Sequence, residues 1–399
     1  MSEPMGRGVP GWVAILRGLG PRRIALRVGA PIIALVIALV ITMILLRAAG
    51  VDPFNAISSM IDYGTTSSSV VEILNRATGY YLSAVAVAIG FRMALFNIGV
   101  DGQYRMAAML AAVLGGTVAL PAPLGQILVI VAAMLIGGAW AAIAGVLKAT
   151  RGVSEVISTI MLNAIATGLI AYLLNPARLA EVRPGSNNVA STPIPKSGQV
   201  PGFDLPGGTV FGLIVLAVAV GIAFQVVINR TRFGFDLRIS GLSATAARAS
   251  GVNSRRMVVT TMALSGVVAG LVGMPELLGA SYQYSLNFPA GLGFTCIAIA
   301  LLGRNHPFGI GLAALLFSFL DQSSDVLQLN DVPKEIVLVM QGTVVLTVVI
   351  VYELVRRFEI RLQQRVVAAE LAAGHTITLE EPAGGSAGGS AGGSAGGMA

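Results

Sequence analysis

The chain has 399 residues, of which 55% are hydrophobic and only 11% charged, and its mean hydropathy is +0.81. Soluble domains carry about 25% charged residues, so these values exclude a soluble globular domain. The formal net charge of +7 does not indicate a nucleic-acid partner, because Lys and Arg gather at the ends of apolar runs. Those runs are long and continuous, which excludes an outer-membrane barrel and predicts an all-α polytopic membrane protein.

A membrane-spanning helix needs about 20 mostly apolar residues, and about ten segments satisfy this rule. The predicted segments are 28–46, 78–94, 103–119, 124–147, 153–174, 209–228, 257–275, 292–303, 307–321 and 334–355. Short loops rich in Lys and Arg stay on the cytoplasmic side. This rule places both chain termini in the cytoplasm, together with loop 229–256, and places loop 175–208 outside.

These assignments divide the chain into three parts. Residues 1–27 are expected to form a basic cytoplasmic N-terminus, and residues 28–370 the transmembrane domain. Residues 371–399 end in a Gly-Gly-Ser-Ala repeat, which cannot bury apolar surface and is expected to be a disordered tail.

The second and eighth segments are short, and each is followed by a polar break. The first break contains Asn97, Asp101 and Gln103, and the second contains Asn305 and His306. Backbone that leaves a helix at membrane depth must be buried in protein or line a wet cavity. Paired interrupted segments also indicate an internal duplication around a pathway.

Two roles are open for these polar residues. They could shape a gate or line a pathway. Alternatively, Asp101 could cap the helix that opens at Gly102, and Asn305 or His306 the helix that opens at Pro307. We favour capping at both breaks.

The fifth segment carries Glu155, Thr159, Asn163 and Thr167 at intervals of four residues, a spacing that places them on one helix face. Polar side chains inside a membrane span face the bundle interior or a cavity, so the stripe could line a solute path. Glu155 could instead reach the interface and pair with Arg151, and we favour this. For Asn163, an interhelical hydrogen bond and a pathway role are equally open.

The loop at 229–256 is a basic, polar island between two apolar runs. Within it, residues 243–249 are rich in Ala and free of Pro and Gly, so a short helix is predicted. A short cytoplasmic helix between two spans is suited to transmitting the movement of a soluble partner to the membrane helices.

Motifs for catalysis are absent from the sequence. No Gly-Lys dipeptide occurs, so the chain has no phosphate-binding P-loop. The two histidines, His306 and His375, lie far apart, and Cys296 is the one cysteine. We therefore expect no catalytic residues, no metal site and no cofactor on this chain.

Four motifs together resemble the ABC-importer permeases of the nucleoside and simple-sugar type, which share a wider group with branched-chain amino acid permeases. The motifs are residues 95–103 (LFNIGVDGQ), 154–163 (SEVISTIMLN), 300–307 (ALLGRNHP) and the 241–253 loop. The forms NIGVDGQ and GRNHP resemble the nucleoside branch more than the sugar branch. Asp101 stands where Glu is commoner in that family.

This resemblance implies a type II importer fold, in which transport, ATP hydrolysis and solute capture are carried out by separate subunits. The partners would be a second, related permease, a separate ATPase with two nucleotide-binding domains that holds ATP and Mg²⁺, and an extracytoplasmic binding lipoprotein. The residues expected to line the pathway are Asn97, Asp101, Gln103, Glu155, Thr159, Asn163 and Asn305. The residues expected to couple to the ATPase are Gly241, Ser243, Ala246, Ala247, Arg248, Gly251 and Asn253.

The expected function is nucleoside uptake across a bacterial plasma membrane as the permease subunit of an ATP-driven importer. A ribose-type sugar permease is the alternative within this family. An ion-coupled secondary transporter and a non-transporting scaffold are rivals outside it. The position of the acidic residues disfavours ion coupling, because Glu155 and Asp101 lie toward the predicted inner ends of their segments, whereas ion-coupled carriers place acids near the membrane midplane.

Overall fold

The computed structural model describes residues 21–48, 50–182, 188–329 and 335–372. Most of the predicted N-terminal segment 1–27 and nearly all of the tail 371–399 therefore lie outside the described residues. The chain divides into two compact units, residues 1–351 and 352–399. The described part of the second unit is the end of one helix, in which Arg357 Nε pairs with Glu353 Oε1 at 2.8 Å.

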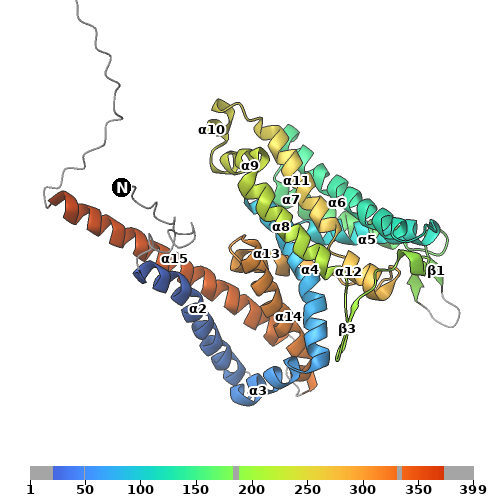
Figure 1. Cartoon of the computed structure of the whole chain (residues 1–399), viewed down its shortest axis with the longest axis horizontal. Coiled ribbons are helices and arrows are strands. Elements are labelled where there is room, and N and C mark those ends of the chain that lie inside the picture. The colour runs from blue at the N-terminus through green and yellow to red at the C-terminus, as the bar shows by residue number, and fades with distance from the viewer. Residues whose placement is uncertain (1–20, 49, 183–187, 330–334, 373–399) are drawn as a thin grey trace, which may run out of the picture. The chain divides into compact units, whose positions relative to one another are not determined.

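Helices make up most of the described structure (Figure 1). The first half contains α2 (Pro21–Ala48), α3 (Pro53–Gly64), α4 (Ser67–Phe91), α5 (Val100–Thr117), α6 (Leu124–Arg151) and α7 (Glu155–Leu173). The second half contains α8 (Ile214–Arg230), α9 (Arg232–Leu242), α10 (Ala244–Ala249), α11 (Ser254–Gly270), α12 (Met274–Glu276), the π-helical turn η2 (Leu277–Ser281), α13 (Leu292–Leu302), α14 (Pro307–Leu329) and α15 (Glu335–Ala372).

Within the described ranges, five helices are long and apolar enough to cross a membrane. Up to seven spans result if each of two bent helix pairs counts as one. These pairs are α2 with α3, bent by 116°, and α8 with α9, bent by 71°. A helical protein with several candidate membrane spans is thus confirmed, while the count of ten stays a prediction.

Helix α4 is not among those five, although it lies in the core of the bundle. It packs against α8, α11, α13 and α14 (Figure 1), and residues 84–88 are fully buried. The predicted segment 78–94 is placed too late, because α4 already begins at Ser67. The missed turns carry Glu72 and Arg76, which interrupt the apolar run. These two exposed charged residues are the reason why a rule based on apolar runs misses the start of α4.

Helices α6 and α11 pack with their backbones in direct contact. A Cβ atom at Gly137 would lie 2.4 Å from the Gly266 carbonyl oxygen. One at Gly270 would lie 2.1 Å from the Ala133 carbonyl oxygen. The glycines therefore let the two backbones touch, which is how small residues drive helix association in membranes.

The loop at 175–208 is more ordered than its composition suggests. It contributes two antiparallel hairpins, β1 (Glu181–Val182) with β2 (Val189–Ala190) and β3 (Phe203–Leu205) with β4 (Gly208–Val210), and the turn η1 (Lys196–Gly198). The Ser191 amide donates to the Tyr284 carbonyl at 2.8 Å, and the Ile194 amide to the Tyr282 carbonyl at 2.8 Å. These bonds fasten the loop to the segment between η2 and α13.

Candidate functional site

The chain leaves α4 through a tight turn and then passes through the protein interior before α5. The Ala94 amide donates to the Phe91 carbonyl at 3.1 Å, and the Leu95 amide to the Gly90 carbonyl at 3.0 Å. Ala94 has a left-handed φ of 55°, the conformation in which helices commonly end. The first predicted break is therefore a helix terminus followed by non-helical backbone.

Asn97 is 1% exposed and holds this break in place. Its Nδ2 donates to Gln103 Oε1 at 3.0 Å and to Ser265 Oγ at 2.8 Å. Its Oδ1 accepts from Gln103 Nε2 at 2.9 Å and from the Gly99 amide at 3.1 Å. Ser265 Oγ in turn donates to the Ala86 carbonyl at 2.6 Å. Because buried amides require such partners, the network fastens the break to α4, α5 and α11.

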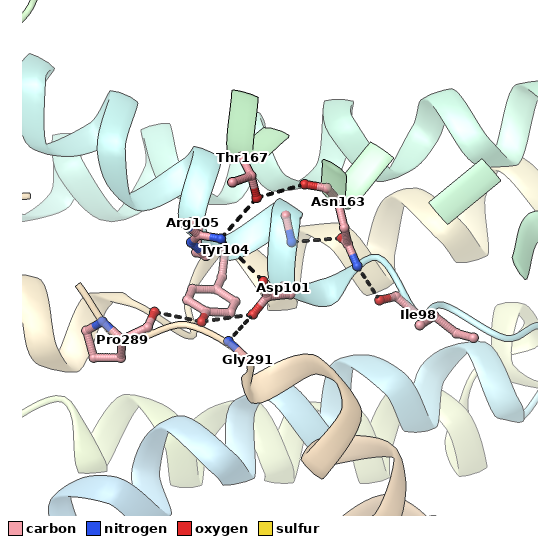
Figure 2. Close-up of polar contacts among 9 residues, drawn as sticks. Ile98, Asp101, Tyr104, Arg105, Asn163, Thr167, Pro289 and Gly291 are labelled. Carbon is pink, nitrogen blue, oxygen red and sulfur yellow. Dashed lines mark hydrogen bonds and ion pairs between the residues drawn. The ribbon is translucent and has the colours of Figure 1, made fainter. Parts of the chain in front are cut away.

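Two glycines let α7 approach the break. A Cβ atom at Gly99 would lie 3.0 Å from the Cβ of Thr159, which is fully buried, and one at Gly102 would lie 2.8 Å from Asn163 Oδ1. Asn163 Nδ2 donates to the Ile98 carbonyl at 2.9 Å, and its Oδ1 accepts from the Gly102 amide at 2.9 Å (Figure 2). Asn163 thus makes the interhelical contact that was one of its two predicted roles.

Glu155 opens α7 and is 6% exposed. It forms an ion pair with Lys148 and accepts from the Phe96 amide at 3.4 Å. The predicted ion pair between Glu155 and Arg151 is wrong. Arg151 ends α6, and Gly152 then reverses the chain with a φ of 69°. This reversal lays the start of α7 beside Lys148, one turn earlier in α6, while Arg151 stays exposed.

Asp101 joins α5 to the segment that leads into α13 (Figure 2). Its Oδ1 accepts from the Gly291 amide at 2.7 Å. Tyr104 Oη lies 3.2 Å from the same oxygen and donates to the Pro289 carbonyl at 2.8 Å. Gly291 has a left-handed φ of 84°, which glycine adopts without strain. Asp101 and Tyr104 therefore set the path of this segment.

The predicted capping role of Asp101 is wrong. Helix α5 begins at Val100 with Gly99 as its N-cap, and no side chain caps it among the described residues. Asp101 lies inside the first turn, where its Oδ2 is 3.6 Å from Arg105 Nη1. The same guanidinium donates to Thr167 Oγ1 at 3.1 Å, so the fourth member of the stripe on α7 also contacts α5.

The second break repeats the turn of the first. The Arg304 amide donates to the Leu301 carbonyl at 2.9 Å, and the Asn305 amide to the Ala300 carbonyl at 2.9 Å. Arg92 Nη2 donates to the Asn305 carbonyl at 2.7 Å and so connects the two breaks. Asn305 Oδ1 accepts no hydrogen bond from the described residues, so this side-chain oxygen does not cap α14.

A cavity of about 430 Å³ lies between α4, α5, α12 and the segment before α13. Its aromatic lining residues are Tyr80, Tyr104, Phe211 and Phe288, and its charged ones are Glu72, Arg76 and Glu276. None of the predicted pathway residues lines it. The available sequence signal was the pair of charged residues upstream of the apolar run at 78–94.

The helix predicted in the basic loop over 243–249 is confirmed as α10. Ser243 Oγ accepts from the Ala246 amide at 3.2 Å and caps the first turn. Ala247 is fully buried, so one side of this short helix is anchored to the protein while its other residues are exposed.

A second helix in this loop, α9, was not predicted. Thr231 Oγ1 caps it by accepting from the Gly234 amide at 3.2 Å. Near its end, a Cβ atom at Gly241 would lie 2.8 Å from the Cα of Met93. The glycine therefore lets the basic loop rest against the first break.

The end of α10 and the start of α11 are also determined by the loop sequence. Gly251 takes a φ of 80° just after α10, as glycine does at helix C-termini. Asn253 Oδ1 then accepts from the Arg256 amide at 3.1 Å and caps α11. Arg248, in the last turn of α10, is exposed.

Metal binding has no support in the described part of the chain, where no group of three or more His, Cys, Asp and Glu residues could hold an ion. Cys296 is a buried free thiol.

Comparison with known proteins connects this geometry to transport. The chain is 32% identical over 353 residues to the glucose ABC transporter permease protein of Haloferax volcanii, covering 85% of this chain and 88% of the relative. It is 34% identical over 286 residues to the guanosine ABC transporter permease protein of Bacillus subtilis, covering 70% and 80%. It is 27% identical over 328 residues to a nucleoside ABC transporter permease protein of Lactococcus lactis, covering 80% and 90%. No solved structure matches the chain.

A family model described as branched-chain amino acid transport system / permease component matches residues 69–349. This region runs from the start of α4 into α15 and includes both breaks and the basic loop. Membership implies a multi-pass membrane subunit that works with a separate ATPase and a substrate-binding protein, as the resemblance of the four motifs predicted. The chain belongs to this family of ABC-importer permeases.

Proposed function

We propose that this chain is the permease subunit of an ATP-driven importer that takes up nucleosides. Two relatives support this solute class, the guanosine permease of Bacillus subtilis and the nucleoside permease of Lactococcus lactis. The NIGVDGQ and GRNHP motifs at the two breaks also resemble the nucleoside branch of the family. The glucose permease of Haloferax volcanii favours a simple sugar as the second candidate.

The observation that carries the ATP-driven mechanism is the exposed basic loop around α10. Leu242, just before the Ser243 cap, is 87% exposed. A hollow of about 370 Å³ follows α10 and is lined by Arg248, Gly251, Val252, Asn253, Ser254 and Arg255. An exposed leucine before α10 and a hollow with basic lining after it suit a protein partner whose docking surface combines apolar and acidic groups.

In this proposal, the ATPase with its two nucleotide-binding domains docks on the loop from the cytoplasm. The coupling residues are Gly241, Ser243, Ala246, Ala247, Arg248, Gly251 and Asn253. Gly241 would pass the motion to the first break, because the loop rests there against Met93. The pathway would run beside the breaks, near Asn97, Asp101, Gln103, Glu155, Thr159, Asn163 and Asn305.

The complete importer would contain this permease, a second, related one as a heterodimer, and an extracytoplasmic binding lipoprotein. Each permease would have ten membrane segments with both termini in the cytoplasm. Ion coupling is the rival mechanism. A proton-gradient uncoupler separates the two, because ATP-driven uptake persists while cellular ATP is maintained.

The experiment that tests the docking loop is Arg248→Glu in the assembled transporter. Reversing this exposed charge should cut radiolabelled nucleoside uptake at least tenfold while ATP hydrolysis and membrane insertion persist, since docking alone is weakened. The matched control is Arg151→Glu, an exposed arginine on the same predicted side of the membrane. Normal uptake by Arg248→Glu would reject the assignment of this loop.

Solute class needs a separate measurement. Cells that express the chain with its own partners should accumulate labelled adenosine and guanosine, and unlabelled glucose should not compete. Uptake of glucose with no uptake of nucleosides would replace the nucleoside assignment by the simple-sugar one.

A further inference from the structure

The cavity of about 430 Å³ beside α4 has walls that are aromatic and held in position. Phe288 stacks on Tyr284 with ring centroids 4.7 Å apart. Tyr104 is fully buried and is held through its hydroxyl by the Pro289 carbonyl. Tyr80 is 8% exposed and donates to Asp321. These rings cannot turn without breaking contacts, so the cavity is preorganised for a ligand.

A fourth aromatic residue, Phe211, is held in the same way from α4. Its amide donates to Asn75 Oδ1 at 2.9 Å, and Asn75 Nδ2 donates to the Thr209 carbonyl at 3.1 Å. Asn75 is 7% exposed. This buried amide therefore ties the end of the β3–β4 hairpin to the cavity wall.

The rim of the cavity is charged. Glu72 and Arg76 lie one turn apart on α4, and both side chains are exposed. Neither makes a hydrogen bond or an ion pair with the described residues. Exposed charged groups favour water or a polar ligand over lipid, so these two residues suit a polar ligand at the cavity mouth.

Glu276 supplies a third charged group. It is half-buried, and its Oε1 accepts from Ser281 Oγ at 2.5 Å. Its other carboxylate oxygen can accept further hydrogen bonds, while the Arg76 guanidinium offers several N–H donors. The cavity therefore presents flat apolar surfaces together with a strong acceptor and a strong donor.

We infer that this cavity binds the transported solute, and that the solute carries a flat heteroaromatic ring with hydrogen-bonding edges, as a nucleobase does. The inference rests on the proposed function and names the site within it. Aromatic walls stack on such a ring, and a base edge has both acceptors for Arg76 and donors for Glu276. The volume lies within the range of small-molecule sites, about 300–1,000 Å³.

Asp101 acts here as a positioning residue. It accepts from the Gly291 amide and contacts Tyr104 (Figure 2). Asp101 thereby holds the segment that carries two lining residues of the cavity, Phe288 and Pro289. The acid predicted from the sequence as part of the pathway thus shapes the site without lining it.

The test is photolabelling with 8-azidoadenosine in native membranes that contain the whole transporter. Labelled peptides, identified by mass spectrometry, should come from α4, α5 or residues 272–292, and unlabelled adenosine but not glucose should prevent labelling. Arg76→Gln and Glu276→Gln should each reduce labelling about tenfold or more at low probe concentration, since each loses a charge-assisted hydrogen bond. Both changes are on the rim and leave the folded core intact.

The matched controls are Arg178→Gln and Glu181→Gln, two exposed residues outside the cavity, which should label like the wild type. Absence of competed labelling, labelling elsewhere, or labelling of both rim variants at the wild-type level would overturn the inference. If adenosine uptake is normal in that case, the proposed function stands without this site. Competed labelling of the cavity in a transporter that fails to take up nucleosides would keep the site and reject the function.

Discussion

The break between α4 and α5 and the break between α13 and α14 begin alike. In each, two backbone amides donate back into the last helical turn, and a non-glycine residue takes a left-handed φ, Ala94 at 55° and Arg304 at 55°. Beyond this shared turn they differ. The first continues as non-helical backbone to Gly99, with Leu95, Asn97 and Gly99 buried, whereas the second passes within a few residues into α14 at Pro307.

The contacts that hold the two breaks differ as well. Asn97 in the first is buried, and its amide satisfies Gln103, Gly99 and Ser265. In the second, Asn305 contributes its backbone carbonyl to Arg92, and its side-chain oxygen has no hydrogen-bond partner among the described residues. The first break is thus held by a side chain of its own, Asn97, whereas the second is held by Arg92, which lies at the first break. The internal duplication itself stays a prediction.

The largest expected effect comes from Asn97→Ala. The Gln103 amide and the Gly99 N–H would lose their partner inside the core, and each buried unsatisfied group costs about 1–3 kcal/mol. We expect the free energy of unfolding to fall by about 3 kcal/mol. Thermal unfolding of the purified protein in detergent would show this as a lower midpoint and as loss of monodisperse material.

The matched substitution in the second break is Asn305→Ala, which should lower the free energy of unfolding by no more than about 1 kcal/mol. No side-chain hydrogen bond is lost, and the cost comes from placing alanine at a left-handed φ of 53° that asparagine tolerates better. Equal effects at Asn97 and Asn305 would contradict the comparison. The double change Asn97→Leu with Gln103→Leu should recover part of the loss, since the Gln103 side-chain amide is removed together with its partner and only the Gly99 N–H stays unsatisfied.

An intermediate effect is expected for Arg92→Leu, which separates the two breaks. The Asn305 carbonyl would lose a charged donor, a bond that contributes about 1.5–3 kcal/mol. Arg92→Lys should retain part of it. Hydrogen exchange followed by mass spectrometry should show faster exchange in residues 303–306 than in residues 95–99. Faster exchange at the first break alone would contradict this assignment.

The smallest effect concerns the left-handed residues themselves. Ala94→Gly should stabilise the protein by about 1 kcal/mol, because a Cβ atom is disfavoured at positive φ. Asn305, with a φ of 53°, should gain less from glycine, since asparagine tolerates this conformation. The two midpoints of thermal unfolding, measured side by side, check the order. A lower midpoint for Ala94→Gly would show that the turn is not strained.

Local chemistry explains the predictions that hold. Apolar runs identified the helices that are long and apolar enough to cross a membrane, and a glycine-free alanine stretch identified α10. Both outcomes depend only on residues that are close together in the sequence. The same holds for the turn after α10, where Gly251 ends α10 and Asn253 caps the start of α11. The order of the four motifs was likewise enough to indicate the transport family.

The sequence by itself determined a helical membrane protein with two breaks, a short helix in a basic loop and a permease family. Only the tertiary structure decided that Glu155 pairs with Lys148, that Asp101 holds Gly291, and that Glu72, Arg76 and Glu276 meet around one cavity. The physical reason is that these contacts join groups from different helices or from the two sides of a chain reversal. Helix periodicity shows which face a side chain occupies, and packing alone determines what that face meets.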